Sequence, residues 1–485
     1  MPPIPARPYA NQVPLCVDLD GTLIKTDLLW ESFVRLLRQN PFCLLHVFGW
    51  WLRGRAFLKQ QLARRVVLDP ATLPCNESFV AFLREHKGAG RKLVLVTASD
   101  RDLAVAVAGR FGLFDEVLGS DGKTNLRSAA KLKALTDKFG ERGFDYAGNS
   151  PADLPVWSGA REAIVVNARP SLAKRAAGRT RVGRVFEPES GRFSALFRSL
   201  RPHQWVKNLI IFVPTLTGHK LTDLPLVWRD VWTFAIFCLC ASGVYLVNDL
   251  LDLDADRHHP TKKGRPLAAG DLPLVAGLLL GPLLLSAGLW LAVRLSWPLA
   301  GVTAVYLLLT TSYTWWVKRM VLLDVFFLAG LYTIRLVAGH TATDIAYSAW
   351  LIMFSMFIFL SLALVKRYVE LNSAKLAEAN KSVPTGRGYT TEDLPVVLSL
   401  GTGSGYLAAL VLALYVNSQQ VVILYRHPNL LLLICPLLLY WISRVWLLAH
   451  RGRMHDDPVV FALKDPASYV VGWMALIVLW LATGN

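Results

Sequence analysis

Hydrophobic and polar residues are distributed very unevenly along this chain of 485 residues. Short apolar runs alternate with polar stretches in the first third, whereas long apolar runs separated by short loops dominate from about residue 207 onward. Because roughly 20 apolar residues in a helix cross a bilayer, nine runs are candidate membrane spans. They lie near 207–219 (short), 230–248, 273–293, 296–314, 321–339, 346–365, 394–416, 428–449 and 468–483. The pattern predicts a globular domain followed by an all-α membrane domain.

The first part contains four short apolar runs, at 13–20, 92–96, 144–148 and 163–166, that are typical of strands. Helical stretches lie between them, which predicts a parallel α/β sheet of the Rossmann-like kind. Ligands of such sheets bind beyond the carboxyl ends of the strands. Polar residues of the kind that bind phosphate or metal lie at those ends or open a following helix: Asp18, Asp20, Thr97, Lys131, Asn149 and Asp153.

The most polar stretch of the membrane part directly follows the span at 230–248. Asn248 opens it, and Asp249, Asp252 and Asp256 recur at i, i+3 and i+7, so on a helix they share one face. Like charges this close repel one another unless a cation lies between them, and with a phosphate present the usual cation is Mg²⁺. Lys262, Lys263 and Arg265 follow and suit phosphate oxygens. The alternative is an acidic helix end before a positive loop, without any ligand.

Charge and cysteine content refine this picture. The formal net charge is +17, but Lys and Arg gather in the short loops between apolar runs, so membrane topology explains them better than nucleic acid does. The positive-inside rule places the N-terminal domain and the acidic stretch in the cytoplasm. The six cysteines form no CxxC pair, which argues against a disulfide framework or a zinc site. The N-terminus lacks an apolar leader, so no signal peptide is expected.

The N-terminal domain, over residues 13–170, resembles the haloacid dehalogenase (HAD) superfamily, specifically its aspartate-nucleophile phosphatases. The signature is Asp18-x-Asp20-Gly-Thr, and the other motifs follow in the family's order. The resemblance implies that Asp18 is the nucleophile and Asp20 the general acid/base, that Thr97 and Lys131 hold the phosphoryl group, and that Mg²⁺ is bound by Asp18, Asp20, Asn149 and Asp153. The family usually has an acid where this chain has Asn149, so the metal loses a negative ligand. A degenerate domain kept for docking is the alternative.

Three further segments complete the N-terminal part. Residues 1–12 are expected to be a tail, and residues 24–90 a small helical cap. The apolar stretch 41–52 of the cap is too short to span a bilayer and is followed by several arginines. Tryptophans beside a basic run suit a helix at the membrane interface, and a buried cap core is an equal alternative. Residues 171–200 are rich in arginine and predict a basic linker.

The membrane domain, residues 201–485, resembles the UbiA superfamily of intramembrane prenyltransferases, because the acidic motif precedes the third span of a nine-span bundle. The resemblance implies that Asp249, Asp252 and Asp256 bind Mg²⁺, which holds a diphosphate leaving group, with Asp249 and Asp252 as catalytic residues. A second acidic motif is expected after the sixth span. That place instead holds Lys366, Arg367 and Glu370, which would better receive an additional phosphate directly.

This departure resembles one branch of the superfamily, the decaprenyl-phosphate phosphoribosyltransferases. The branch transfers 5-phosphoribosyl from phosphoribosyl diphosphate to a polyprenyl phosphate. Further matches that we expect to bind substrate are Lys207, Asn208, Lys318, Arg319 and Arg335. Arg335 lies inside a span, where Asp324 is a candidate partner. Asp456, Asp457, Lys464 and Asp465 are candidates to close the site.

Together these features predict a bifunctional integral membrane enzyme of a bacterial-type inner (plasma) membrane. Its membrane domain would make a polyprenyl-phosphoryl phosphoribose, and its N-terminal domain would remove the 5-phosphate. The alternative is transfer of a prenyl group from its diphosphate to an aromatic acceptor, which would need a second pair of aspartates near Lys366. A third interpretation, a non-enzymatic lipid carrier or scaffold, would need the carboxylates to be free of metal.

Overall fold

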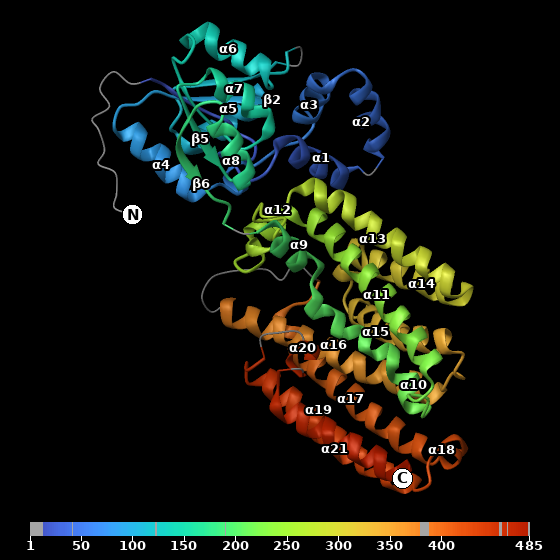
Figure 1. Ribbon diagram of the computed structural model, residues 1–485. Coiled ribbons are helices and arrows are strands. Elements are labelled where there is room, and N and C mark those ends of the chain that lie inside the picture. Colours follow the sequence, from blue (N-terminus) through green and yellow to red (C-terminus); the bar gives the residue numbers. More distant parts are fainter. Residues whose placement is uncertain are drawn as a thin grey trace. The chain divides into compact units, whose positions relative to one another are not determined.

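The computed structural model describes residues 13–40, 42–121, 124–189, 191–378, 388–454, 458–462 and 464–483. The chain forms two compact units (Figure 1). The first comprises Met1–Arg201 with Tyr245–Pro282, and the second comprises Pro202–Val244 with Leu283–Asn485. The acidic motif therefore belongs to the same compact unit as the N-terminal domain.

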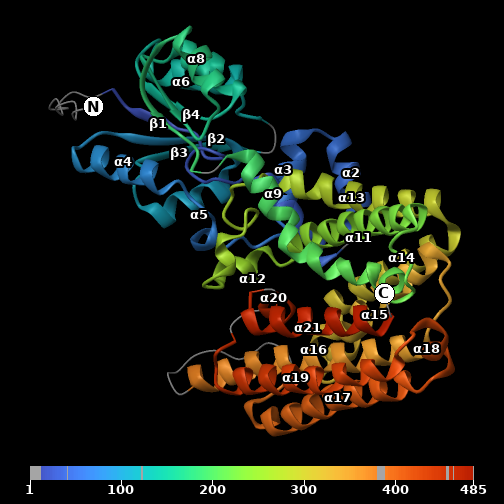
Figure 2. The same ribbon diagram turned by 60° about the horizontal axis from the view of Figure 1, so that its bottom comes forward.

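A six-stranded parallel sheet forms the centre of the first unit, which confirms the predicted α/β class (Figure 2). In spatial order its strands are β3 (Glu116–Ser120), β2 (Leu93–Asp100), β1 (Leu15–Val17), β4 (Asp145–Gly148), β5 (Glu162–Val166) and β6 (Arg181–Phe186). The chain order reverses beside β1, because β2 lies on one side and β4 on the other. Such a switch point leaves a crevice at the carboxyl end of the central strand, where Asp18 follows β1.

Helices cover both faces of this sheet, because side chains of a strand alternate between its two faces. Leu15 and Val17 pack with Phe79 and Val107 on one face, and Cys16 packs with Trp157 on the other. The helices of the first face are α4 (Glu77–Gly88) and α5 (Arg101–Phe111). Those of the second are α6 (Ala129–Phe139), α7 (Leu154–Gly159) and α8 (Pro170–Ala177).

The sheet continues into the segment that the sequence predicted to be a basic linker. Residues 171–200 instead contain most of α8, the strand β6 and α9 (Arg192–Leu200), so the linker prediction is wrong. β6 pairs with β5 along its length, yet only Phe186 of it is buried. An edge strand that carries exposed arginines gives no alternating apolar signal, which is why β6 was not predicted. The other edge strand, β3, was not predicted either.

The cap is smaller than predicted. It consists of α1 (Leu28–Gln39), α2 (Cys43–Leu52) and α3 (Arg55–Ala63) around a separate apolar cluster. The helix α4 packs on the sheet instead, so the cap ends before it. One side of α2 contributes Cys43 and Trp50 to the cap cluster. Large apolar side chains of the same segment are exposed: Phe42, Leu44, Leu45, Phe48, Trp51 and Leu52.

Long apolar helices make up the rest of the chain. They are α11 (Leu224–Leu251), α13 (Leu274–Leu295), α14 (Trp297–Trp315), α15 (Leu323–Thr343), α16 (Ala349–Glu378), α17 (Leu394–Val416), α19 (Ile434–His450) and α21 (Pro466–Thr483). Shorter ones are α10 (Val213–Thr217), α12 (Leu253–His258), α18 (Gln419–Leu424) and α20 (Pro458–Ala462).

Seven helices within the described residues are long and apolar enough to cross a membrane, so the count of nine is not confirmed. The run near 207–219 forms the 3-10 segment Pro202–Phe212 and the five-residue α10, too short to span. The helix α14 has 19 residues but is not one of the seven, since hydroxyl side chains such as Thr310, Thr311 and Ser312 lower its hydrophobicity. The other seven predicted spans match a membrane-length helix each.

Candidate active sites

Asp18 lies at the carboxyl end of β1, in contact with a buried lysine. Lys131 from the first turn of α6 donates through Nζ to Asp18 Oδ1 at 2.6 Å and to Tyr146 Oη at 2.9 Å. Thr22 Oγ1 lies 3.3 Å from Asp18 Oδ2. Asp18 and Lys131 are both buried. The structure thus brings together two residues that lie 113 positions apart and that the sequence predicted for one site.

Asp20 is held by neutral donors. The backbone N–H of Leu28, at the start of α1, donates to Oδ1 at 2.9 Å. Ser99 Oγ lies 2.6 Å from Oδ2, closer than Thr97 Oγ1 at 3.3 Å. Thr97 also accepts from the Ser99 N–H, so this predicted residue orders the end of β2. Ser99 was missed, although its position two residues after Thr97, on the same face of the strand, could have indicated it.

Burial dominates the protonation of both aspartates. It raises the pKa of Asp18 to about 7 although Lys131 opposes the shift, and it raises the pKa of Asp20 to about 6. Burial by itself would lower the pKa of Lys131, but Asp18 and Asp153 raise it overall, so the ammonium stays charged. A carboxyl group with a pKa near 6 can both give and take a proton close to neutral pH, which suits Asp20 to acid/base chemistry.

Asp153 orders a loop. Its Oδ1 accepts from Tyr146 Oη at 2.9 Å, and its Oδ2 accepts from the N–H groups of Asn149 at 3.1 Å and Ser150 at 2.9 Å. Asn149 in turn packs against Gly21, where an added Cβ would lie 2.0 Å from Asn149 Nδ2. Gly21 has φ +76° and so combines a left-handed turn with this close approach.

These residues offer oxygen donors of the type that Mg²⁺ prefers. Among the residues that the structure describes, no three His, Cys, Asp or Glu side chains converge as a ready metal centre. Asp18, Asp20 and the amide oxygen of Asn149 therefore fit the cation by donor type, with less negative charge than an all-carboxylate set would give. Asp153 already accepts protein hydrogen bonds on both of its oxygens.

A cavity of about 1070 Å³ opens in front of Asp18 and Asp20. Its walls combine apolar side chains of the cap, such as Trp30 and Trp51, with residues 270–274, which follow the acidic motif. Four arginines also line it: Arg55, Arg127, Arg169 and Arg192. The cavity can thus receive an anionic group together with an apolar one.

Arginines neutralise the acidic motif in the same unit. Arg265 Nη1 lies 2.6 Å from Asp256 Oδ2 and 3.1 Å from Asp249 Oδ1. Arg201, which was not among the predicted site residues, donates to Asp249 from the end of α9. Asp249 and Asp256 therefore do share one face, as predicted. The cation that the sequence argument required between them is a guanidinium in this structure, so their clustering does not by itself require a metal.

Asp252 lies at the junction between α11 and α12, with φ −94° and ψ 10°. Helical hydrogen bonds run across the junction, from Asp252 N to Asn248 O and from Asp256 N to Asp252 O, both at 2.8 Å. Lys262 and Lys263 are exposed in the following turn. The predicted motif is thus one nearly continuous helical surface followed by a basic turn.

In the second unit, Arg335 pairs with Asn208 and not with Asp324. Arg335 Nε donates to Asn208 Oδ1 at 2.8 Å, and Lys207 Nζ lies 5.5 Å from the ring centre of Tyr332. Asp324 and Arg335 lie eleven positions apart on α15, which at 1.5 Å per residue separates them by roughly 16 Å. The suggested pair is therefore wrong for a geometric reason.

Asp324 instead binds Arg367 at 2.9 Å and accepts from Tyr389 Oη at 2.7 Å. Arg367 is 1% exposed and also pairs with Glu370. Its charge is thus compensated by two carboxylates, while Lys366 is partly exposed. Lys318 and Arg319 lie on the short turn Val317–Arg319.

The segment between α19 and α21 is described only in part. Asp465 forms a bidentate pair with Arg444, at 2.7 and 2.9 Å, and caps α21. Lys464 is exposed beside it. Asp456 and Asp457, like Arg387 of the loop after α16, lie outside the described residues.

Comparisons with known proteins cover both parts of the chain. A family model described as the UbiA prenyltransferase family matches residues 211–465, and one described as haloacid dehalogenase-like hydrolase matches residues 15–158. An uncharacterized protein, y4nM, of Sinorhizobium fredii is 38% identical over 96% of this chain and 90% of that protein. A decaprenyl-phosphate phosphoribosyltransferase of Mycolicibacterium smegmatis is 36% identical over 44% of this chain and 68% of that enzyme. A solved UbiA homolog from Archaeoglobus fulgidus bound to GPP and Mg²⁺ aligns at 14% identity with a TM-score of 0.44, over 59% of this chain and 99% of that one.

Proposed function

The chain belongs to the UbiA prenyltransferase family and carries a HAD-like domain in front of the family's membrane domain, and on that premise we propose that it is an enzyme with two successive activities on one lipid. The membrane domain transfers 5-phosphoribosyl from phosphoribosyl diphosphate to a polyprenyl phosphate. The HAD-like domain then removes the 5-phosphate from the lipid-linked product.

The observation that carries the first activity is the composition of the segment after the sixth predicted span. Lys366, Arg367 and Glu370 occupy the place where a prenyltransferase is expected to have a second pair of aspartates. A donor with a 5-phosphate needs a cation there, and a prenyl diphosphate does not. Because Arg367 is buried and Lys366 is partly exposed, we assign the phosphate contact to Lys366. The relative from Mycolicibacterium smegmatis carries the name of this activity.

The acidic motif would receive the diphosphate of the donor. Asp249, Asp252 and Asp256 would hold Mg²⁺, whose contribution is to neutralise the leaving diphosphate. Lys262, Lys263 and Arg265 bind the diphosphate oxygens. The phosphate oxygen of the lipid attacks ribose C1, the bond from C1 to the diphosphate breaks, and pyrophosphate leaves. Asn208 and Arg335, paired inside the second unit, orient the ribosyl phosphate.

In the HAD-like domain, Asp18 attacks the phosphorus of the 5-phosphate and Asp20 protonates the departing ribose oxygen. Asp20 then accepts a proton from the water that hydrolyses the aspartyl phosphate, and inorganic phosphate is released. Lys131 neutralises the attacking carboxylate and the phosphoryl oxygens. Asp18, Asp20 and Asn149 would hold Mg²⁺, which supplies further charge neutralisation, and Asp153 keeps Asn149 in place.

Seven helices of membrane length make the protein an integral membrane protein. We place the N-terminal domain and the acidic motif on the cytoplasmic side of a bacterial-type inner membrane, because Lys and Arg are concentrated in the loops on that side. Phosphoribosyl diphosphate is a water-soluble donor, so this side gives it access.

Incubation of membranes that contain the protein with radiolabelled phosphoribosyl diphosphate and a polyprenyl phosphate tests the proposal. We expect label in the lipid extract that depends on the protein and is lost with EDTA. A parallel incubation supplies a prenyl diphosphate and 4-hydroxybenzoate. Prenylated hydroxybenzoate without ribosylated lipid would replace our proposal with prenyl transfer to an aromatic acceptor.

A further inference from the structure

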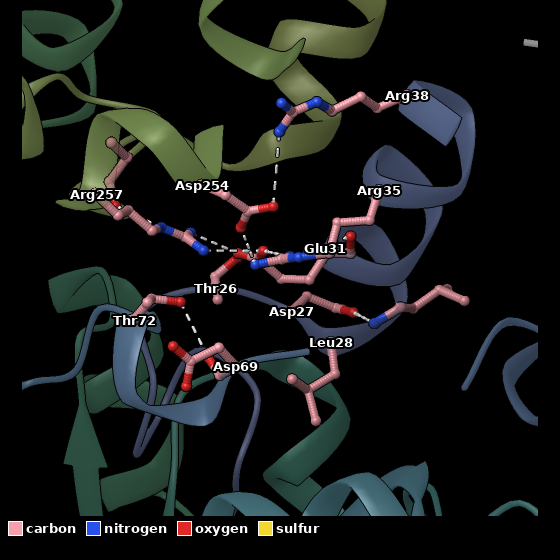
Figure 3. A network of polar contacts seen from close by, with 12 residues as sticks. Thr26, Asp27, Leu28, Glu31, Arg35, Arg38, Asp69, Thr72, Asp254 and Arg257 are labelled. Atoms are coloured by element: carbon pink, nitrogen blue, oxygen red, sulfur yellow. Dashed lines mark hydrogen bonds and ion pairs between the residues drawn. The ribbon is translucent and has the colours of Figure 1, made fainter. Parts of the chain in front are cut away.

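A buried network of charges joins the cap helix α1 to α12, the helix that carries Asp256. Arg257 donates to the carboxylate of Glu31 through Nη2 at 2.6 Å and through Nη1 at 3.0 Å. Arg35 of α1 binds both Glu31 and Asp254 of α12. Figure 3 shows these side chains converging from the two helices. All of them belong to the first unit.

The Glu31 end of the network is buried, whereas the Asp254 side chain is 35% exposed. The Glu31 side chain is fully buried, and those of Arg257 and Arg35 are 3% and 7% exposed. Burial alone would raise the pKa of Glu31, but the two guanidiniums lower it overall, so Glu31 stays ionised. An exposed surface pair contributes little, whereas a buried carboxylate with two arginines fixes the positions of the elements that carry it.

Glu31 also holds the segment that contains Asp20. Its Oε1 accepts from Thr26 Oγ1 at 2.7 Å, and the Thr26 carbonyl accepts from the N–H of Gly21 at 3.1 Å. At the start of the same helix, the Leu28 N–H donates directly to Asp20. A displacement of α1 would therefore move the Leu28 N–H that binds Asp20, and it would disturb Thr26, which holds the neighbouring Gly21.

A second contact brings the loop after α12 against the same segment. Gly270 has φ +76°, and a Cβ added to it would lie 2.6 Å from Lys25 Cβ and 3.1 Å from Pro74 Cγ. Arg257 Nε donates to the carbonyl of Ala268 at 3.1 Å, which ties this loop to the charged network. Residues 270–274 then form part of the wall of the cavity in front of Asp18.

We infer that this loop of the transferase completes the phosphatase site, with Glu31 and Arg257 as positioning residues for Asp20. The inference rests on the phosphatase activity proposed above. Arg257 and Gly270 lie within the stretch that matches the UbiA family, and Asp20 and Glu31 lie within the stretch that matches the HAD-like hydrolases. Arg257 and Gly270 of the UbiA-type domain thus support the chemistry of the HAD-like domain. The phosphatase site is therefore complete only when the loop after α12 packs against it.

The test measures hydrolysis of p-nitrophenyl phosphate with Mg²⁺ by the purified full chain, so that it does not depend on the transferase reaction. Arg257→Gln and Gly270→Ala should lower kcat by roughly tenfold or more, because a small displacement of a catalytic group is costly. KM should stay within about twofold, since the phosphate-binding groups are untouched. Arg257→Lys keeps the positive charge but loses the bidentate contact with Glu31, so its kcat should lie between those of the wild type and Arg257→Gln.

Two controls match these variants. Gly264→Ala changes a glycine of the same loop whose added Cβ would meet nothing within 4 Å. Arg38→Gln removes an arginine of α1 that is 46% exposed and lies 4.0 Å from Asp254. Both should hydrolyse like the wild type.

Each contrary result has a distinct meaning. Wild-type kcat in Arg257→Gln and Gly270→Ala overturns the inference alone. Absence of phosphomonoester hydrolysis by the wild-type chain overturns the phosphatase assignment and the inference with it. Gel filtration gives the folded fraction. If kcat per folded molecule is unchanged while the folded fraction falls, Arg257 and Gly270 contribute to stability only. That result also overturns the inference.

Discussion

Two acidic clusters of the first unit are neutralised in opposite ways. Asp18 and Asp20 have one lysine and several hydroxyl and N–H donors around them, and burial raises the pKa values of the two carboxyls to about 7 and about 6. Asp249 and Asp256 are bridged by guanidiniums, which carry a permanent charge. The first cluster is thus set to change its protonation near neutral pH, as proton transfer requires. The second is paired with arginines, whose guanidiniums can also bind diphosphate oxygens.

The largest effect should come from Asp18 of the first cluster, the proposed nucleophile. Asp18→Asn should reduce phosphomonoester hydrolysis by roughly 10³-fold or more, because an amide side chain cannot form the aspartyl phosphate. Transfer should continue, so lipid that still carries the 5-phosphate should accumulate, as chromatography of the lipid products would show. Asp137→Asn, an exposed aspartate of α6, is the matched control. Identical product ratios in wild type and Asp18→Asn would mean that the domain does not act on this lipid.

Asp249→Ala or Asp252→Ala should abolish transfer, a loss of roughly 10³-fold, while hydrolysis of p-nitrophenyl phosphate persists. Removal of Asp249 leaves Arg201 and Arg265 without a shared partner, but it chiefly removes an oxygen donor for the cation. EDTA should also abolish transfer by the wild type, but unlike these substitutions it should stop the Mg²⁺-dependent hydrolysis of p-nitrophenyl phosphate as well. Asp344→Asn, at an exposed aspartate, is the control. Transfer that survives both substitutions and EDTA would refute the metal site and leave the arginines as the main diphosphate ligands.

The sequence predicted those parts of the fold and of the sites that depend on a local pattern of residues. The four inner strands, the residues at their ends and the acidic motif follow from apolar runs and short spacings. The edge strand β6 has no such signal, because charged side chains on an exposed edge resemble a loop. The other edge strand, the five-residue β3, was not predicted either. The pairing of Glu31 with Arg257 joins residues 226 positions apart, and nothing in either neighbourhood indicates its partner. Arg201 became visible as a partner of Asp249 only through such a long-range contact, whereas Ser99 had a local signal in its spacing from Thr97.

The buried Glu31 pairs with Arg257, the neighbour of Asp256. The charge of Glu31 should contribute to the free energy of unfolding. Glu31→Gln leaves Arg257 and Arg35 without a countercharge and should cost about 3 kcal/mol at neutral pH. Since the folded pKa of Glu31 is lowered below its usual value of 4.5, this contribution is present above that pH and is lost as the pH falls through the folded pKa. Thermal unfolding should therefore separate wild type from Glu31→Gln at pH 7, and the difference between their midpoints should shrink as the pH falls below 4.5. A difference that stays the same at every pH would show that Gln acts through its shape and not through the lost charge.

The smallest effect should come from Lys366, which extends the comparison to the second unit. Loss of one charge-assisted phosphate contact costs roughly 1.5–3 kcal/mol, so Lys366→Gln should raise KM for phosphoribosyl diphosphate by roughly tenfold or more and leave KM for the lipid nearly unchanged. Arg367→Gln should behave differently, because it removes the ion-pair partner of the buried Asp324. Its main effect should therefore be on the free energy of unfolding and not on KM. Steady-state kinetics with each substrate varied in turn, beside thermal unfolding of both variants, separates the two cases. If Lys366→Gln raised the KM values for phosphoribosyl diphosphate and for the lipid equally, Lys366 would not bind the 5-phosphate of the donor. The argument against a prenyl diphosphate donor would then lose its main support.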